Sequence, residues 1–167
     1  ASAVRSVNLD GDEKLETLIG EGLFVWGDET GRQELTRLQH AVGIEVLNDE
    51  LYVADTYNHR IKSIDPENGA SKGVAGSGIP GLADGYGESS QLAEPSGLSA
   101  VGDTLYIADT NNHQVRTLDT RTGTLSTLAL SNQHLVPLVH RTAADEKVIF
   151  PQIAVAPGQV DLTVDLE

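Results

Sequence analysis

A short segment, Asp-Thr-x-Asn-His, carries most of the chemistry-bearing side chains of this sequence and occurs twice. Its members are Asp55, Thr56, Asn58 and His59 in the first copy and Asp109, Thr110, Asn112 and His113 in the second. Carboxylates and imidazoles are groups that ligate metals or transfer protons. Asp and Asn side chains also bond their own backbone in turns and tolerate a left-handed backbone. Because both copies carry the same residues, we interpret the segment as a structural turn that every repeat needs, with no catalytic residue and no metal site.

The two copies are parts of a longer repeat. Residues 51–59 recur at 105–113, which is 54 positions later. A third, partial copy opens the chain, where residues 4–8 resemble residues 61–65. Repetition at a fixed period of this length is the sequence signature of repeat architectures. We therefore expect the back half of one unit, followed by two whole units.

Each whole unit contains four short runs with strand composition, separated by turn residues. The predicted strands are 42–47, 50–54, 60–65 and 71–75 in the first unit, and 97–101, 104–108, 114–119 and 124–129 in the second. Four-stranded antiparallel units in tandem are typical of a β-propeller, whose blades pack face to face around a central channel. The predicted fold is therefore all-β, a partial propeller of about two and a half blades with a short β tail.

The repeat also sets the expected domain boundaries. They are 1–34 for the back half of one blade and a long connection, 35–76 for a complete blade, 77–130 for a connection and a second complete blade, and 131–167 for the start of a truncated β-rich domain. In that last part, residues 160–166 alternate apolar and polar side chains, as in a strand with one buried face. The chain contains no methionine, so we expect it to be a processed or excised piece.

The repeated segment resembles the NHL repeat, in which an aliphatic-Tyr-aliphatic-Ala-Asp-Thr-x-Asn-His run precedes an aliphatic-basic-x-aliphatic-Asp strand. A narrower resemblance rests on residues 22–28, 37–40 and 76–85, which are similar to the propeller of the NHL repeat-containing protein 2 family and its bacterial relatives. In that family a thioredoxin-like domain precedes the propeller and a small β-rich domain follows it. The resemblance implies that this segment comes from a larger thioredoxin-like/NHL protein, whose thioredoxin-like part is missing from the sequence.

Charge and composition exclude several partners. Asp and Glu number 25 against 11 Lys and Arg, which gives a net charge of −14. A surface this acidic repels phosphate backbones and anionic headgroups, so neither nucleic acid nor a membrane is expected as a partner. Cysteine is absent, which removes disulfides, thiol catalysis and zinc–thiolate sites. No apolar run is long enough to span a bilayer, and we expect a soluble, cytoplasmic chain without a cofactor.

One end of the predicted blades is the candidate for ligand binding. In an up-and-down blade, the turn between the second and third strands lies at the same end as the connection between blades, which here is long. Long loops placed by a rigid scaffold often carry binding residues. The candidates at this end are Phe24, Trp26, Asp28, Tyr57, Arg60, Asp84, Tyr86 and Asn111, which supply both stacking groups and carboxylates.

Three functions follow from these patterns. The leading hypothesis is a non-catalytic scaffold that binds a protein or small-molecule ligand, with further propeller blades or copies of itself covering its open blade faces. The alternative is a metal-dependent propeller enzyme of the lyase or lactonase type, with a divalent ion at the channel and donors from Asp55, His59, Asp109 and His113. RNA binding, as in some NHL propellers, needs a basic face, and the long loops hold more acidic than basic residues.

Overall fold

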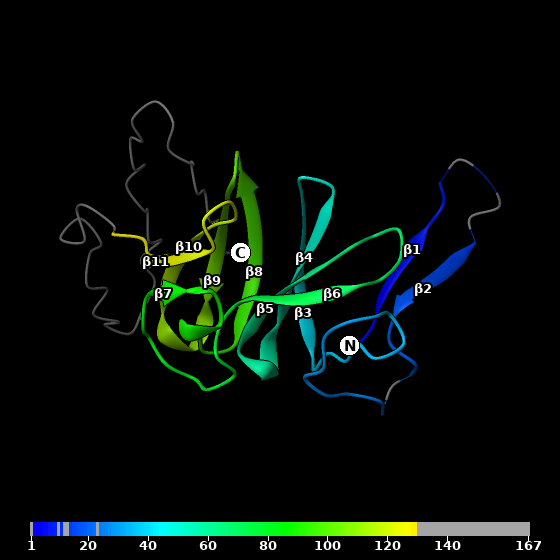
Figure 1. Cartoon of the computed structure of the whole chain (residues 1–167), viewed down its shortest axis with the longest axis horizontal. Helices are drawn as coiled ribbons and strands as arrows, with labels where there is room; N and C mark the ends of the chain where they lie inside the picture. The colour runs from blue at the N-terminus through cyan, green and yellow to red at the C-terminus, as the bar shows by residue number, and fades with distance from the viewer. Residues whose placement is uncertain (1, 10, 12–13, 23, 130–167) are drawn as a thin grey trace, which may run out of the picture. The chain divides into compact units, whose positions relative to one another are not determined.

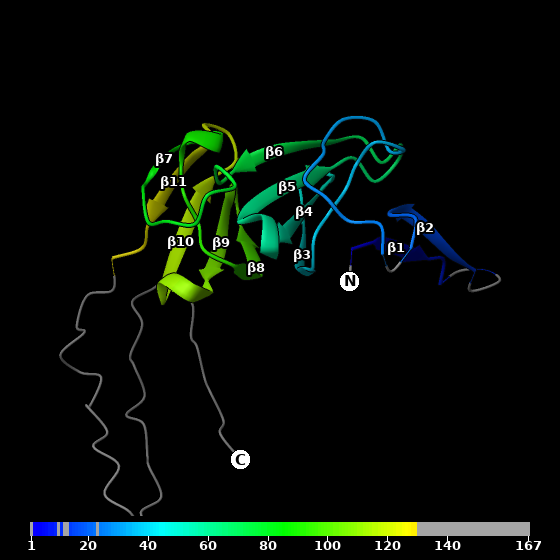
Figure 2. The same ribbon diagram turned by 90° about the horizontal axis from the view of Figure 1, so that it is seen from below.

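The computed structural model describes residues 2–9, 11, 14–22 and 24–129, which form three antiparallel sheets (Figure 1). A hairpin consists of β1 (Val4–Val7) and β2 (Leu15–Ile19). The next sheet, blade one, has the strand order β3 (Ala41–Leu47), β4 (Glu50–Asp55), β5 (Arg60–Ile64) and β6 (Ser71–Ala75). The last sheet, blade two, has the order β7 (Gly85–Tyr86), β11 (Thr124–Thr127), β10 (Gln114–Asp119), β9 (Thr104–Asp109) and β8 (Pro95–Val101). Figure 2 shows blade one between the hairpin and blade two.

The predicted all-β class is confirmed, and the eight predicted strands of the two blades are present with ends that differ by no more than two residues. Strand β7 was not predicted. It pairs with the outer edge of β11, where Gly85 lies opposite Leu125 and Tyr86 opposite Thr124. Two residues, one of them glycine, cannot show the alternation that identifies a strand. The boundary at 131 and the predicted strand at 160–166 lie outside the described residues.

Short turns with left-handed residues join the strands of each blade. Asn48 and Asp49, between β3 and β4, have φ values of 52° and 61°. Two positive values in a two-residue hairpin match the right-handed twist of the strands. The β4–β5 turn is the 3-10 segment η1 (Thr56–Asn58), closed by His59 at φ 54°, and the β9–β10 turn is η3 (Thr110–Asn112), closed by His113 at the same φ. The repeated segment therefore builds the same backbone twice.

The main core lies between the two blades. It includes Tyr52, Ala54 and Ile61 from blade one and Leu105, Ile107, Leu118 and Leu125 from blade two. Because side chains alternate along a strand, Leu51 and Val53 face the other way and pack with Ile19 of the hairpin in a second cluster. Within the described ranges, no helix is long and apolar enough to cross a membrane.

The outer faces of the two blades are less covered than the faces between them. Ala54 is fully buried against blade two, whereas its counterpart Ala108 is exposed. Leu47 is 9% exposed and its counterpart Val101 is 56% exposed. On the other side, Ile44 of β3 is exposed, although its counterpart Leu98 packs into the core between the blades. Blade one and blade two therefore each present apolar positions that a further blade would bury.

Candidate functional site

The carboxylate of Asp55 lies fully buried beneath the β4–β5 turn. Its Oδ1 accepts a hydrogen bond from the backbone N–H of Gln39 at 2.6 Å. Its Oδ2 accepts one from Asn58 Nδ2 at 2.7 Å and pairs with Lys62 Nζ at 2.8 Å. Burial raises the pKa of Asp55, and the Lys62 ammonium, the Asn58 amide and the Gln39 N–H oppose that rise. This carboxylate therefore holds the turn, the preceding loop and strand β5 together.

Lys62 is the cation of this network, and its side chain is fully buried. Besides Asp55, its Nζ contacts Asp28 Oδ1 at 2.9 Å and the backbone oxygen of Arg37 at 2.9 Å. An ammonium has three hydrogens, so all of its donors have partners. Strand alternation points Lys62 to the same face as Ile64, toward the long loop that precedes blade one.

Blade two contains the same network at equivalent positions, with arginine in place of lysine. Asp109 is fully buried, accepts from the N–H of Ala93 at 2.7 Å and from Asn112 Nδ2 at 2.7 Å, and pairs with Arg116 Nη1 at 2.8 Å. Arg116 Nη2 also pairs with Asp84 Oδ1 at 2.6 Å. The slight burial of Asp84 raises its pKa, but hydrogen bonds from Thr127 and Arg116 lower it more, so the pKa lies below its ordinary value. In each blade, one buried cation thus pairs with the buried aspartate and with a second aspartate from the loop.

The two cations are not equally well satisfied, which gives a first prediction. Arg116 Nε is buried and has no hydrogen-bond partner among the described residues, whereas every donor of Lys62 is used. We expect Arg116→Lys to change the free energy of unfolding by about 1 kcal/mol or less, because lysine serves the equivalent position and removes the unpaired donor. The measurement is urea denaturation of the full chain. The matched control, Lys62→Arg, adds an unpaired donor and should cost more, so the opposite order of the two variants would contradict the prediction.

The same asparagines hold the two long loops onto the turns. Asn58 Nδ2 donates to the backbone oxygen of Gly27 at 2.6 Å, and Asn112 Nδ2 donates to that of Gly81 at 2.7 Å. Each loop then carries apolar side chains into solvent close to these anchor points. They are Phe24 (90% exposed) and Trp26 (60%) in the first loop, and Ile79 (65%) and Leu82 (54%) in the second. We call the end of the blades that bears the two loops and the turns η1 and η3 the loop face.

Two equivalent corners of the loop face have different chemistry. In blade one, the rings of His40 and Tyr57 stack with centroids 4.5 Å apart, and Tyr57 is half exposed. In blade two, Glu94 and Asn111 occupy the positions equivalent to His40 and Tyr57. The N–H of Glu94 donates to His59 Nδ1 at 3.1 Å, which connects the two corners. An aromatic platform and a carboxylate therefore lie on neighbouring blades.

Arg60 joins the two loops across the first blade. Its Nε pairs with Asp28 Oδ2 at 2.8 Å and its Nη1 with Glu88 Oε1 at 2.6 Å. The guanidinium also donates to the backbone oxygens of Gly76 and Ser77. Arg60 is mostly buried, so its role in the structure is to fix the loops in place. It is therefore less available to a ligand than its charge suggests.

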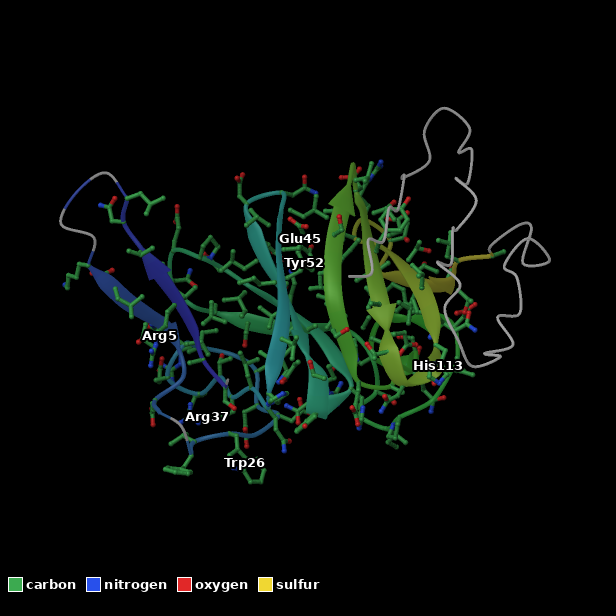
Figure 3. The ribbon with its side chains drawn as sticks, turned by 180° about the vertical axis from the view of Figure 1, so that it is seen from behind. Arg5, Trp26, Arg37, Glu45, Tyr52 and His113 are labelled. Atoms are coloured by element: carbon green, nitrogen blue, oxygen red, sulfur yellow. The ribbon has the colours of Figure 1, made fainter. Side chains whose placement is uncertain are left out.

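Six of the eight candidates proposed from sequence lie on the loop face with their side chains at least partly exposed: Phe24, Trp26, Asp28, Tyr57, Asp84 and Asn111. Figure 3 shows Trp26 and His113 toward the same end of the sheets, with Glu45 toward the other end. Tyr86 lies elsewhere. The N–H of Gly87 bonds to the oxygen of Gly123 in the β10–β11 turn, and the Tyr86 ring packs beside Gly123. Turns at the two ends of an antiparallel sheet alternate, so Tyr86 lies at the end opposite η3.

Sequence reasoning left out several residues of this site. Lys62 and Arg116 were noted only as the basic position of a repeated strand, and a charge directly after an aliphatic residue in a core strand was the available signal for an ion-pair partner. Ile79 and Leu82 lie in the loop that the sequence did place on this face. Nothing in the sequence indicated that Glu94 would lie next to His59, because that contact joins two blades.

The site has little to offer a divalent metal. Among the described residues, no group of three His, Asp or Glu side chains is arranged to hold an ion. The predicted donors Asp55 and Asp109 are bonded to a cation, an amide and a backbone N–H, which a metal would have to displace. His59 and His113 lie in different blades, and the Nδ1 of His59 accepts from the Glu94 backbone.

The two antiparallel sheets, each with its buried Asp–Asn–cation turn, coincide with two NHL repeats found by comparison with known families, so they are blades of a β-propeller. The NHL repeat family model matches residues 38–62 and 92–118. The chain is 40% identical to NHL repeat-containing protein 2 of Bos taurus over 75% of its length and 36% identical to that of Homo sapiens over 78%. It is 32% identical, over 99% of its length, to Protein SUPPRESSOR OF QUENCHING 1, chloroplastic, of Arabidopsis thaliana.

The chain spans 18% of the Arabidopsis protein and 19% of the bovine and human proteins. Among solved structures, it is similar to auxiliary nutrient binding proteins from two Bacteroides species. The protein from Bacteroides ovatus matches with 27% identity and a TM-score of 0.43, over 48% of this chain and 23% of that one. The protein from Bacteroides thetaiotaomicron matches with 16% identity and a TM-score of 0.45, over 76% and 32%.

Proposed function

We propose that this chain is a non-catalytic segment of a propeller that binds a protein or ligand on its loop face. The observation that carries the proposal is that hydrogen bonds join each of the two long loops to one of the two buried networks. Asn58 and Asn112 each bond both the buried aspartate and the loop backbone, so the exposed apolar side chains stand on a rigid base. Rigid loops with exposed apolar side chains are suited to recognition, because little conformational entropy is lost on binding.

We also propose that further blades cover the outer faces of the blade pair, within a larger protein that has a thioredoxin-like domain. The uncovered apolar positions of β3 and of β8–β9 support the first part, because their counterparts between the blades are buried. The resemblance to the NHL repeat-containing protein 2 family supports the second. A cytoplasmic location remains a prediction.

The experiment compares the binders from its source cells that the chain retains when the loop face is altered with those that it retains when a different surface is altered. The test variant is Phe24→Ser with Trp26→Ser, which alters two exposed side chains of the loop face. The matched control is Val101→Ser with Val7→Ser, which alters two exposed side chains on β8 and β1, away from the loop face. Because the altered side chains do not contribute to the core, stability should change by about 0.5 kcal/mol or less per site. We expect the loop-face variant to lose binders that the control retains, as measured by quantitative mass spectrometry. Equal retention by both variants would refute the proposed binding face.

A further inference from the structure

The two blades separate the residues of the loop face into a constant set and a variable set. Asp and Asn of the repeated turn are the same in both blades, and their polar groups are bonded inside the protein. Three positions on the same face, each with a side chain that is at least partly exposed, differ between the blades: Trp26 and Pro80, His40 and Glu94, and Tyr57 and Asn111. The scaffold does not require one residue type at these positions. Their side chains are therefore the ones that can determine which ligand is bound.

The first property of the loop face is its exposed apolar surface. Trp26 and Tyr57 are both exposed. The residues that follow them are joined by a hydrogen bond, since Asn58 donates to the backbone oxygen of Gly27. Leu82 is exposed next to Gly81, which Asn112 holds in the same way. Exposed large apolar side chains that gather on one face mark an interaction site.

The second property is a surplus of negative charge. Residues 20–40 and 76–94 contain seven acidic residues and two basic ones, Arg32 and Arg37. Asp28 and Asp84 pair with Lys62 and Arg116 beneath them, which also pair with the buried Asp55 and Asp109. Two carboxylates on this face, those of Glu29 and Glu94, have no ion-pair partner in the described part of the chain. The side chain of Glu29 folds back beside Gly27. Glu94 follows the core residue Ala93, and its backbone N–H bonds to His59.

Resting on the proposed function, we propose that the loop face binds a basic segment of a partner protein, in which arginine or lysine side chains alternate with apolar ones. A guanidinium stacks on an aromatic face and pairs with a carboxylate, and the stacked His40–Tyr57 pair and Glu94 offer both. Apolar side chains of the segment pack on Trp26 and Leu82. The opposite charge speeds the encounter and rejects acidic partners.

The single tryptophan of the chain makes the test direct, because Trp26 reports on the loop face alone. The full chain is titrated with three extended, tryptophan-free peptides: one alternates arginine and leucine, one glutamate and leucine, and one arginine and serine. We expect the arginine–leucine peptide to shift the Trp26 emission with saturation, and the glutamate–leucine peptide to leave it unchanged. The arginine–serine peptide should bind about tenfold more weakly, because it lacks the apolar contacts.

A charge-matched pair of variants separates local recognition from the general attraction of an acidic protein. The test variant is Glu29→Gln with Glu94→Gln, and the control is Glu50→Gln with Glu67→Gln, which removes the same charge at the opposite end of blade one. We expect the test variant to bind the arginine–leucine peptide about 5- to 10-fold more weakly, and the control to bind within about twofold of the unaltered chain. Far-ultraviolet circular dichroism and thermal denaturation verify that both variants are folded.

The outcomes keep this inference distinct from the proposed function. Equal weakening in both variants overturns the basic-segment inference. Saturable binding of the glutamate–leucine peptide at Trp26 would overturn it while leaving a binding loop face in place. The loop face itself fails only if Phe24→Ser with Trp26→Ser retains every binder that the Val101 and Val7 control retains.

Discussion

Lys62→Met is expected to lower the free energy of unfolding by about 3–5 kcal/mol, because it leaves the buried Asp55 carboxylate without its cation. Methionine fills nearly the same volume, so the loss reports charge and not packing. The Asn58 amide and the Gln39 N–H remain, and two neutral donors do not replace an ammonium at 2.8 Å. Asp28 loses the same partner but lies at the surface, where water replaces part of the interaction. Equilibrium urea denaturation of the full chain measures the change.

The control for this variant is Lys72→Met. Lys72 lies on β6, is largely exposed and pairs with Glu50 at 3.1 Å, so its loss should cost less than about 1 kcal/mol. A second variant tests the cause: adding Asp55→Asn to Lys62→Met removes the unpaired charge and should recover part of the loss. If Lys62→Met cost no more than Lys72→Met, the buried pair would not be compensating a desolvated carboxylate.

Ile107→Ala is expected to cost about 2–5 kcal/mol, because it opens a cavity in the core between the blades. Ile107 is fully buried in that core. It lies in the middle of β9, opposite Leu98 of β8 and Arg116 of β10. Hydrogen-bonded strands on both sides prevent the backbone from collapsing into the space, so the cost should fall in the upper part of the range. The free energy of unfolding from urea denaturation gives the value.

Val101→Ala is the matched control for the core variant. Val101 belongs to β8 of the same blade and is 56% exposed, so truncating it should change stability by about 0.5 kcal/mol or less. In a protein where further blades cover blade two, this small cost would rise, because the counterpart of Val101 in blade one, Leu47, is buried. Equal costs for Ile107→Ala and Val101→Ala in the full chain would show that the two blades do not share a continuous core.

Much of the fold followed from local pattern. The 54-residue repeat, the alternating runs and the turn residues predicted eight strands of the two blades, because alternation in a half-buried strand is visible within five or six residues. Strand β7 was missed because its pairing depends on the free edge of β11, almost forty residues later. The same dependence explains Tyr86: sequence order assigned it to the connection between blades, and pairing with Thr124 moved it to the opposite end.

The identity of the repeated residues is a local property, and it determined where the strands turn and that Asp55 and Asp109 serve the same role in two blades. The partner of each buried carboxylate, the bond from Glu94 to His59 and the uncovered outer faces were decided only in the folded chain. The physical reason is that burial and ion pairing depend on which surfaces meet. Surfaces that meet bring together residues from separate strands and loops. The sequence pattern does not encode the distances between those residues in space.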